Sequence, residues 1–195
     1  GVDINATGRE NLVLQAQFYG LRGAALRSRV EALLDRFSLA PAADREARGY
    51  SGSMKRKLDV AMGLVHTPRV LFLDEPTLGL DPQSRNQMWT HVQNLNQTDG
   101  VTVFLTTHYM DEAERVAHRI AIIDHGRIVA IGSSAELKQR TNTESLEAAY
   151  LALTDKEREV FGAVARGLSN TEIAALVFAS ESTVKTHVGA ILRKL

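Results

Sequence analysis

The feature that most constrains this 195-residue chain is a short apolar run, residues 70–73, which ends abruptly at Asp74, Glu75 and Pro76. A short run without polar residues is typical of a parallel strand that is buried on both faces. Open parallel sheets bind ligands beyond the carboxyl ends of their strands. At that edge Asp74 could hold Mg²⁺ and Glu75 could polarise an attacking water, whereas the alternative interpretation is an ordinary acidic turn.

A helix that opens at Ser51 and Gly52 precedes this strand, and its first turn contains Lys55, Arg56 and Lys57. Cations at the start of a helix oppose the helix dipole by a few tenths of a kcal/mol each. Two interpretations remain open for these charges. Either they form a solvated surface, or an anion sits at the helix start and is bound by backbone N–H groups and the Ser51 hydroxyl.

A second apolar strand is predicted over residues 101–105, shortly before His108. Between the two strands, Asp81 as N-cap and Pro82 at the first helical position predict a helix over residues 83–96. A histidine at a strand end can hydrogen-bond a phosphate oxygen or hold the attacking water, and the alternative is a structural histidine.

The other expected elements complete a regular alternation of helices and strands. A loop and then a helix are expected over residues 5–19, and further helices over residues 25–37 and 111–117 and from Ser133 onwards. A hairpin over residues 120–131 turns at His125 and Gly126. Capping-box patterns pair Thr7 with Glu10 and Ser133 with Glu136. The apolar residues of the first helix are Leu12, Leu14, Ala16 and Phe18, and those at helical spacing in the second are Leu26, Val30, Leu33, Leu34 and Phe37. This alternation predicts an α/β layer fold with a helical subdomain ahead of the first strand.

Composition excludes several classes of protein. Lys and Arg together number 23, as do Asp and Glu, so no overall basic field indicates nucleic acid, although a local basic face remains open. The absence of cysteine excludes disulfides and cysteine metal sites and fits a reducing cytosol. No apolar run approaches the roughly 20 residues that span a bilayer. Because the chain begins with Gly1 and not with Met, we expect it to be a piece of a longer protein.

Four motifs, in order within residues 5–154, closely resemble the ATPase of an ABC transporter of the drug- or antibiotic-exporter kind. YSGSM at residues 50–54 resembles the signature motif, LFLDE at residues 71–75 resembles Walker B, residues 79–81 resemble the D-loop, and His108 resembles the switch histidine. The resemblance implies ATP and Mg²⁺ as cofactors. It also implies a second ABC ATPase subunit and a membrane permease as partners, and a cytoplasmic location at the inner face of the membrane.

The same resemblance implies a role for each matching residue. Asp74 would serve Mg²⁺, Glu75 would be the general base, and His108 would contact the γ-phosphate and the water. The implied nucleotide-binding residues are Ser51, Gly52, Ser53 and Asp81. The three signature residues would hold the γ-phosphate of ATP bound to the partner subunit, and Asp81 would couple two sites across a dimer.

The sequence departs from the ABC pattern at several points. Ser53 replaces the usual second glycine of the signature, which adds a Cβ where backbone approaches phosphate closely. No GxxxxGK(S/T) motif, the Walker A loop that binds the β- and γ-phosphates, occurs in these 195 residues, and the Q-loop glutamine is absent as well. We therefore predict that the chain does not hydrolyse ATP alone and needs a P-loop from a second subunit. Unpaired edges of the two strands predict a dimer or other self-association.

From residue 153 the pattern changes to three short helices. Capping boxes are expected at Thr154 with Glu157 and at Ser169 with Glu172, Gly167 ends the first helix, and Ser180 opens the third. The predicted core residues are Val160, Val164, Ile173, Leu176, Val184, Val188 and Ile191. This compact trihelical unit resembles the LuxR-type helix-turn-helix through LTDKEREV, ARGLSNTEIA and SESTVKTHVGAILRKL. A trihelical unit for protein contact is the alternative.

The LuxR resemblance implies that residues 180–195 form a recognition helix that enters the major groove of double-stranded DNA. Lys185, Thr186 and Gly189 occupy the base-facing positions, although Gly189 can reach no base and weakens the helix. The residues implied to touch phosphate are Ser169, Asn170, Thr183 and His187.

The sequence therefore predicts two parts. Residues 1–152 form an α/β, partial P-loop NTPase-like ABC ATPase layer fold with a helical subdomain, and residues 153–195 form a small all-α trihelical helix-turn-helix module. The favoured function is a fragment of the ATP-binding subunit of an ABC exporter that carries a LuxR-type DNA-binding module. The alternatives are a transcriptional regulator with a degenerate ABC-like front domain and a non-functional hybrid.

Overall fold

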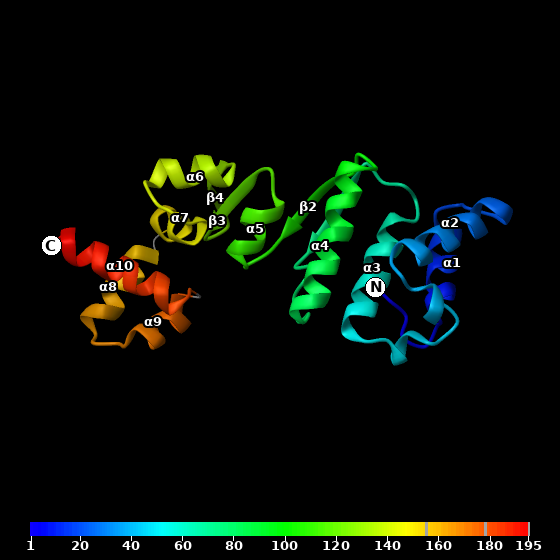
Figure 1. Cartoon of the computed structure of the whole chain (residues 1–195), viewed down its shortest axis with the longest axis horizontal. Coiled ribbons are helices and arrows are strands. Elements are labelled where there is room, and N and C mark those ends of the chain that lie inside the picture. Colours follow the sequence, from blue (N-terminus) through cyan, green and yellow to red (C-terminus); the bar gives the residue numbers. More distant parts are fainter. Residues whose placement is uncertain (155, 178, 195) are drawn as a thin grey trace. The chain divides into compact units, whose positions relative to one another are not determined.

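The computed structural model describes residues 1–154, 156–177 and 179–194 (Figure 1). The chain forms two compact units, Gly1–His108 and Tyr109–Leu195. Helices and short strands occur in both units and three helices follow at the end, which confirms the predicted fold class. The predicted division between residues 152 and 153 falls within the second unit and stays a prediction. No helix in the described ranges has the length and apolar character needed to cross a bilayer.

The first unit begins with three helices, α1 (Gly8–Phe18), α2 (Gly23–Arg36) and α3 (Gly52–Leu64), which pack side by side in Figure 1. The short 3-10 helices η1 (Ala40–Ala42) and η2 (Ala47–Gly49) connect α2 to α3. The predicted capping box of α1 is confirmed, because the Glu10 N–H donates to the Thr7 hydroxyl and the Thr7 N–H donates to the Glu10 carboxylate. The buried residues of α2 and its C-cap are those predicted: Leu26, Val30, Leu33, Leu34 and Phe37.

Only half of the four apolar residues named for α1 are buried. Leu12 and Ala16 are fully buried, whereas Leu14 is 57% exposed and Phe18 is 83% exposed. Residues four apart share a helix face, but a residue two positions away lies on the opposite side. Burial of Leu12 and Ala16 therefore places Leu14 and Phe18 toward solvent.

Tyr50 ties the start of α3 to α1. Its hydroxyl donates to the Ala42 carbonyl at 2.8 Å, and its ring lies so close to Gly8 that a Cβ there would be 2.1 Å from the tyrosine oxygen. The Arg45 guanidinium lies 5.5 Å from the ring centroid. These contacts hold the residue immediately before Ser51, so they position the turn that opens α3.

A two-stranded parallel sheet completes the first unit. Strand β1 (Val70–Asp74) pairs with β2 (Thr102–Thr106), and the register places Asp74 opposite Thr106. The connecting helix is α4 (Pro82–Gln97), capped by Asp81 as predicted. Helix α3 packs on β1 so closely that a Cβ at Gly63 would lie 3.1 Å from the Leu71 side chain. Both strands thus end at one edge, with their carboxyl ends together.

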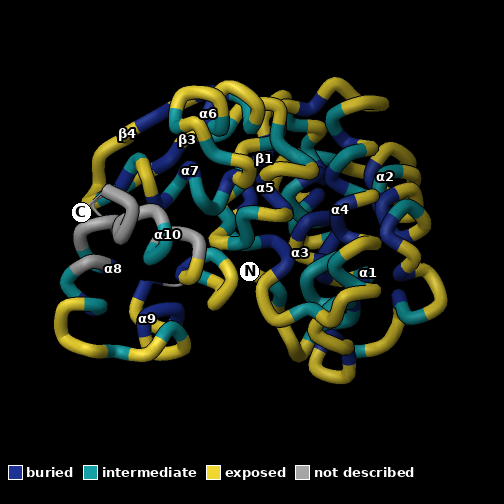
Figure 2. Tube along the Cα trace, turned by 60° about the vertical axis from the view of Figure 1, so that its left-hand side comes forward, coloured by how far each residue is buried: buried dark blue, intermediate teal, exposed yellow. Residues whose placement is uncertain are grey.

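The prediction that β1 is buried on both faces was wrong, and β2 is not fully buried either. Leu71 and Leu73 are buried, but Phe72 is 72% exposed and Phe104 is 57% exposed, and Val70 on the same face is also exposed. Figure 2 colours the Cα trace by this burial. Side chains alternate between the faces of a strand. The described part of the chain packs helices against the leucine face, so the phenylalanine face stays open.

The second unit opens with α5 (Met110–Val116), the antiparallel hairpin of β3 (Ile120–Asp124) and β4 (Arg127–Gly132), α6 (Ser134–Thr141) and α7 (Leu146–Leu153). The predicted hairpin turn is confirmed. Both of its residues, His125 and Gly126, have a positive φ, as this kind of two-residue turn requires. The capping box of Ser133 with Glu136 is confirmed as well. The buried core residues here are Ala113, Ile122, Ala130, Leu137 and Leu146.

The chain ends in α8 (Lys156–Ala165), α9 (Asn170–Val177) and α10 (Glu181–Lys194). Their buried core residues are Val160, Ala163, Ile173, Ala174, Val177 and Val184, with Val164 and Val188 partly buried against them. Leu176 was wrongly predicted to be buried; it is 46% exposed because its neighbours Ile173, Ala174 and Val177 form the inner face of α9. The side chains of Glu157 and Ile191 lie outside the described residues. The Thr154 hydroxyl donates to the Tyr150 carbonyl at the end of α7.

The exposed phenylalanine face predicts self-association. Phe72 and Phe104 have ring centroids 5.5 Å apart, so together they present one apolar surface. We expect the purified chain to elute as a dimer or larger species in size-exclusion chromatography with light scattering. The double variant Phe72→Thr with Phe104→Thr should shift it toward the monomer, because removing exposed aromatic area weakens association.

The matched control for that experiment is Phe18→Thr, which removes an equally exposed ring from α1. It should leave the elution unchanged. A wild-type chain that runs as a monodisperse monomer would contradict the prediction.

Candidate functional site

The turn that opens α3 contains the three residues predicted to hold a γ-phosphate. The Ser51 hydroxyl caps the helix by accepting from the Met54 N–H at 3.2 Å, and it lies 3.0 Å from the Ser53 hydroxyl. Helix geometry leaves the N–H groups of Gly52 and Ser53 without an intrahelical acceptor. Ser51 and Gly52 are exposed, so this helix start has the donors and the access that an oxygen anion needs.

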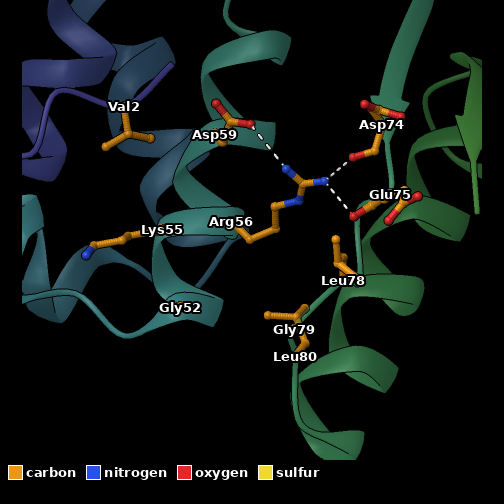
Figure 3. Close-up of a pocket in the computed structure, with 10 residues that line it drawn as sticks. All are labelled: Val2, Gly52, Lys55, Arg56, Asp59, Asp74, Glu75, Leu78, Gly79 and Leu80. Carbon is orange, nitrogen blue, oxygen red and sulfur yellow. Dashed lines mark hydrogen bonds and ion pairs between the residues drawn. The ribbon is translucent and has the colours of Figure 1, made fainter.

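Arg56 differs from both interpretations of the cationic first turn. Its guanidinium donates to the backbone carbonyls of Asp74, Glu75 (2.7 Å) and Pro76 (3.1 Å), and it forms an ion pair with Asp59 at 3.8 Å. Figure 3 shows this side chain directed from α3 to the end of β1. Because the Arg56 guanidinium binds the carbonyls that follow the strand, the side chain neither extends into solvent nor keeps its donors for an anion.

The strand-end acids take different partners. The Asp74 carboxylate accepts from the Thr106 hydroxyl, and the Glu75 N–H donates to the Thr106 carbonyl at 3.2 Å. Glu75 has φ of 44°, a left-handed conformation that is uncommon for a residue with a side chain and costs on the order of 1–3 kcal/mol. This conformation turns the chain sharply, so Asp74 and Glu75 leave the strand in different directions.

The structure brings Glu75 and His108 together, although 33 positions separate them in the sequence. The imidazole Nδ1 lies 3.3 Å from a Glu75 carboxylate oxygen, and both side chains are accessible to solvent. This is the separation of a general base from a histidine that orients it or its water.

Asp81 serves as the N-cap of α4. Its carboxylate accepts from the N–H groups of Gln83 at 3.1 Å and Ser84 at 3.0 Å. Hydrogen bonds from Ser84, then from Gln83, hold the pKa of Asp81 below its ordinary value. The carboxylate is thus kept ionised and exposed, and its predicted coupling role across a dimer stays a prediction.

A cavity of about 610 Å³ lies between the start of α3 and the end of β1 (Figure 3). Its lining includes Gly52, Lys55 and Arg56 from α3, and Asp74 and Glu75 from the strand end. Leu78, Gly79 and Leu80 of the following loop close another side. The cavity brings part of the signature turn together with the two acids, whereas Ser51, Ser53, Asp81 and His108 do not line it.

A magnesium site was predicted at Asp74. Within the described residues, no cluster of three or more acidic or histidine side chains could hold a metal ion. Mg²⁺ in nucleotide sites commonly takes one or two carboxylates and completes its octahedron with water and phosphate oxygens. A single exposed carboxylate at Asp74 fits that donor set, and it does not fit a site made of protein ligands alone.

The predicted DNA-contacting residues lie at the start of α9 and along α10. Ser169 forms the predicted capping box, in which its hydroxyl accepts from the Glu172 N–H at 3.3 Å and its N–H donates to the Glu172 carboxylate at 2.8 Å. The Ser169 hydroxyl also donates to that carboxylate at 2.7 Å, which lowers the pKa of Glu172. Asn170 is the first residue of α9. The Ser180 hydroxyl caps α10 by accepting from the Thr183 N–H at 3.2 Å, which confirms Ser180 as the residue that opens this helix.

Lys185 is exposed on α10, one turn after Glu181. A Cβ at Gly189 would meet no atom within 4 Å, so the surface of α10 is open at this glycine. The side chains of Thr186 and His187 lie outside the described residues. Thr183 and Lys185 are therefore the predicted contacts on α10 whose side chains are described.

Two contacts were missed from the sequence. In the sequence Arg56 is one of three adjacent cations, and no sequence pattern pairs an arginine with carbonyl groups about twenty residues away. The second contact is that of Glu147 on α7, whose carboxylate accepts hydrogen bonds from Ser180 and Thr183 at the start of α10. A glutamate in the first turn of a short helix is ordinary, so the sequence contained no signal for the second contact.

Comparison with protein families matches both parts of the chain. Residues 2–78 match the ABC transporter family, and residues 151–195 match the bacterial regulatory proteins of the luxR family. The first match includes the signature turn and the strand-end acids. The second includes α8, α9 and α10.

Curated relatives of the first part are ATP-binding proteins named for drug resistance or for Nod factor export. The chain is 50% identical over 145 residues to the daunorubicin/doxorubicin resistance ATP-binding protein DrrA of Streptomyces peucetius, which covers 74% of this chain and 44% of the relative. It is 46% identical over 132 residues to the Nod factor export ATP-binding protein I of Burkholderia pseudomallei (strain 1710b), which covers 68% of this chain and 43% of the relative. The chain thus spans less than half the length of these relatives.

Solved structures show the same fold. The ATP-binding subunit of an ABC transporter superposes with a TM-score of 0.68 at 28% identity, covering 78% of this chain and 64% of that one. A dimeric ATP-binding cassette in a post-hydrolysis state with ADP and Pi gives a TM-score of 0.60 at 25% identity, covering 68% and 59%. The chain therefore joins an ABC transporter ATP-binding segment, similar to those of drug exporters, to a LuxR-type helix-turn-helix segment.

Proposed function

We propose that the first unit forms one half of a composite ATP site and acts on nucleotide held by the P-loop of a second ABC subunit. The observation that carries the proposal is the exposed start of α3, where the Ser51 cap leaves the N–H groups of Gly52 and Ser53 available to an oxygen anion. These residues belong to the segment that matches the ABC transporter family. They would bind the γ-phosphate from the partner's side.

The strand-end residues would act on a nucleotide bound to a P-loop adjacent to them. Mg²⁺, held by the Asp74 carboxylate and phosphate oxygens, would supply charge neutralisation for phosphoryl transfer. Glu75 would accept a proton from the attacking water as general base, and His108, 3.3 Å from it, would orient that water and contact the γ-phosphate. Asp81, kept ionised by its cap bonds, would couple the two sites of a dimer.

Support for the proposed partners comes from the relatives, which are named for resistance to daunorubicin and doxorubicin and for Nod factor export. An exporter of such compounds needs a membrane permease, so we propose that the first unit docks on a permease at the cytoplasmic face of the membrane. A second ABC ATPase subunit would supply the P-loop.

The composite site is tested by mixing the chain with a full-length ABC ATP-binding subunit whose own signature motif has been inactivated. Neither protein alone should release phosphate from ATP, and the mixture should. Gly52→Asp in this chain should lower the restored rate at least about a hundredfold, because a carboxylate would stand where the γ-phosphate needs donors. The variant should fold, since a Cβ at Gly52 meets no atom within 4 Å and an acid suits a helix start.

The matched control is Gly49→Asp, the same change three residues earlier, where a Cβ has only ordinary contacts with Arg45. It should keep the restored rate. Phosphate release by this chain alone that disappears in Glu75→Gln would contradict the composite site and favour a self-sufficient ATPase.

Arg56 should hold the two halves of the site in place. Arg56→Met keeps the aliphatic length but removes the donors to the carbonyls of Asp74, Glu75 and Pro76. We expect it to lower the free energy of unfolding of the first unit by about 2–3 kcal/mol, because the bonds involve a charged, partly buried group. Urea unfolding followed by the fluorescence of Trp89, the single tryptophan, which is buried on α4, reports this unit directly.

Lys55→Met is the control for Arg56, because it removes a positive charge from the preceding residue of the same cavity. It should change the urea midpoint little. Equal midpoints for the two variants would show that the Arg56 bonds do not stabilise the unit.

We further propose that the carboxyl-terminal helices bind double-stranded DNA. Support comes from the match of residues 151–195 to the luxR family and from the exposed Lys185 on α10. In this arrangement α10 enters the major groove, Lys185 donates to base edges, and Thr183 and the start of α9 contact phosphates. The ABC match and the DNA-binding match concern different segments, so neither function depends on the other.

Lys185→Gln should weaken binding to a fluorescently labelled mixed-sequence duplex about tenfold in an anisotropy titration at low salt, through loss of a cation in the groove. Lys55→Gln makes the same chemical change in the first unit and should bind as the wild type does. Identical titrations for the two variants would contradict the assignment of α10 as the DNA-binding helix.

A further inference from the structure

The start of α10 is occupied by a carboxylate that comes from outside the luxR-matching segment. Glu147, in the first turn of α7, accepts from the Ser180 N–H at 3.0 Å and from the Thr183 hydroxyl at 2.7 Å. The sequence separations are 33 and 36 residues, so this is a tertiary contact and not a local cap. Residues 151–195 match the luxR family, whereas Glu147 precedes them.

The environment of Glu147 suits any oxygen anion. The start of α10 presents backbone N–H groups and the positive end of a 14-residue helix, and Glu147 also lies at the positive end of its own helix. Carboxylate and phosphate oxygens accept hydrogen bonds from the same donors. The starts of α7 and α10 and the Thr183 hydroxyl therefore all stabilise the negative charge of the Glu147 carboxylate.

Thr183 cannot serve Glu147 and a DNA phosphate together. A hydroxyl has one proton to donate, and here the Ser180 hydroxyl, 2.7 Å from the Thr183 oxygen, can donate to it while Thr183 donates to Glu147. A phosphate at this position would meet occupied donors and an adjacent negative charge. DNA contact through Thr183 therefore requires the Glu147 carboxylate to leave.

We propose that Glu147 occupies the place of a DNA phosphate at the start of α10 and so restrains DNA binding from within the chain. The inference rests on the proposed DNA-binding function of the carboxyl-terminal helices. It assigns a regulatory contact to the ABC-related side of the junction, which the helix-turn-helix match does not include. Anything that draws Glu147 away would free the Ser180 N–H and the Thr183 hydroxyl for phosphate.

Release needs little rearrangement. Helix α7 is anchored by Leu146 and Leu151, both almost fully buried. The Glu147 side chain is only half-buried, so it can rotate about its own side-chain bonds without moving the helix. The first turn of α10 has an acid of its own, Glu181. Its carboxylate accepts from the Thr171 hydroxyl at 2.8 Å and is thereby held toward α9. Glu147 thus contacts the Ser180 and Thr183 donors of α10 through a side chain, and a side-chain rotation would remove it.

Glu147→Gln tests the proposal, because the amide keeps the size and one acceptor oxygen but removes the charge. In anisotropy titrations of the full chain with a labelled mixed-sequence duplex, we expect about tenfold tighter binding than wild type at low salt. The slope of log affinity against log salt concentration should become steeper, by at most about 0.9, because removing the carboxylate raises the net positive charge that faces the phosphates by one.

Glu144→Gln is the matched control, since it removes one negative charge from an exposed glutamate three residues earlier. It should leave the slope at the wild-type value. Thr183→Val, combined with Glu147→Gln, should abolish most of the gain, because the freed hydroxyl is the group that contacts phosphate. Thermal unfolding of each variant by circular dichroism checks that α10 remains folded.

The outcomes separate this inference from the function on which it rests. If the wild type binds duplex and Glu147→Gln has the affinity and slope of Glu144→Gln, the restraint is wrong while DNA binding stands. Weaker binding by folded Glu147→Gln would also overturn it, since Glu147 would then hold α10 in its binding position. If neither wild type nor Glu147→Gln binds duplex at low salt, DNA binding itself fails.

Discussion

The Arg56 guanidinium is the interaction on which the candidate nucleotide site depends. It extends from the first turn of α3 and donates to three successive carbonyls, those of Asp74, Glu75 and Pro76, where β1 ends. Carbonyls that leave a strand lose their ladder partners, and a buried carbonyl without a donor is costly. One planar cation satisfies all three and fixes the distance between the signature turn and the strand-end acids. The cavity lined by Gly52, Asp74 and Glu75 exists because that distance is held.

Local features were predictable from the sequence because their physics is local. The capping boxes at Thr7, Ser133 and Ser169 and the caps at Ser51 and Asp81 each join groups two or three residues apart. The hairpin turn at His125 and Gly126 depends only on the φ angles of two residues. Such patterns need no knowledge of the rest of the chain, and they placed the ends of most elements within a few residues.

Burial was less predictable, since it depends on what lies opposite each side chain. Phe72 and Leu73 are adjacent and similarly apolar, yet one is 72% exposed and the other is buried against the helices. Leu14 and Leu176 are likewise good core residues by composition that face away from the packed side of their helices. The apolar run of β1 shows that a strand is present, but the number of covered faces is set by the neighbouring elements.

The family relationships and the positions of Asp74, Glu75, His108, Thr183 and Lys185 were determined by the sequence, because motifs are strings of neighbouring residues with set spacing. Only the tertiary structure decided which distant groups meet. It paired Glu75 with His108, bound Arg56 to the end of β1, and placed Glu147 on the donors of α10. The physical reason is that these contacts join residues about 18 to 36 positions apart. At such separations the path of the chain, and not the residue type, brings two groups within hydrogen-bond distance.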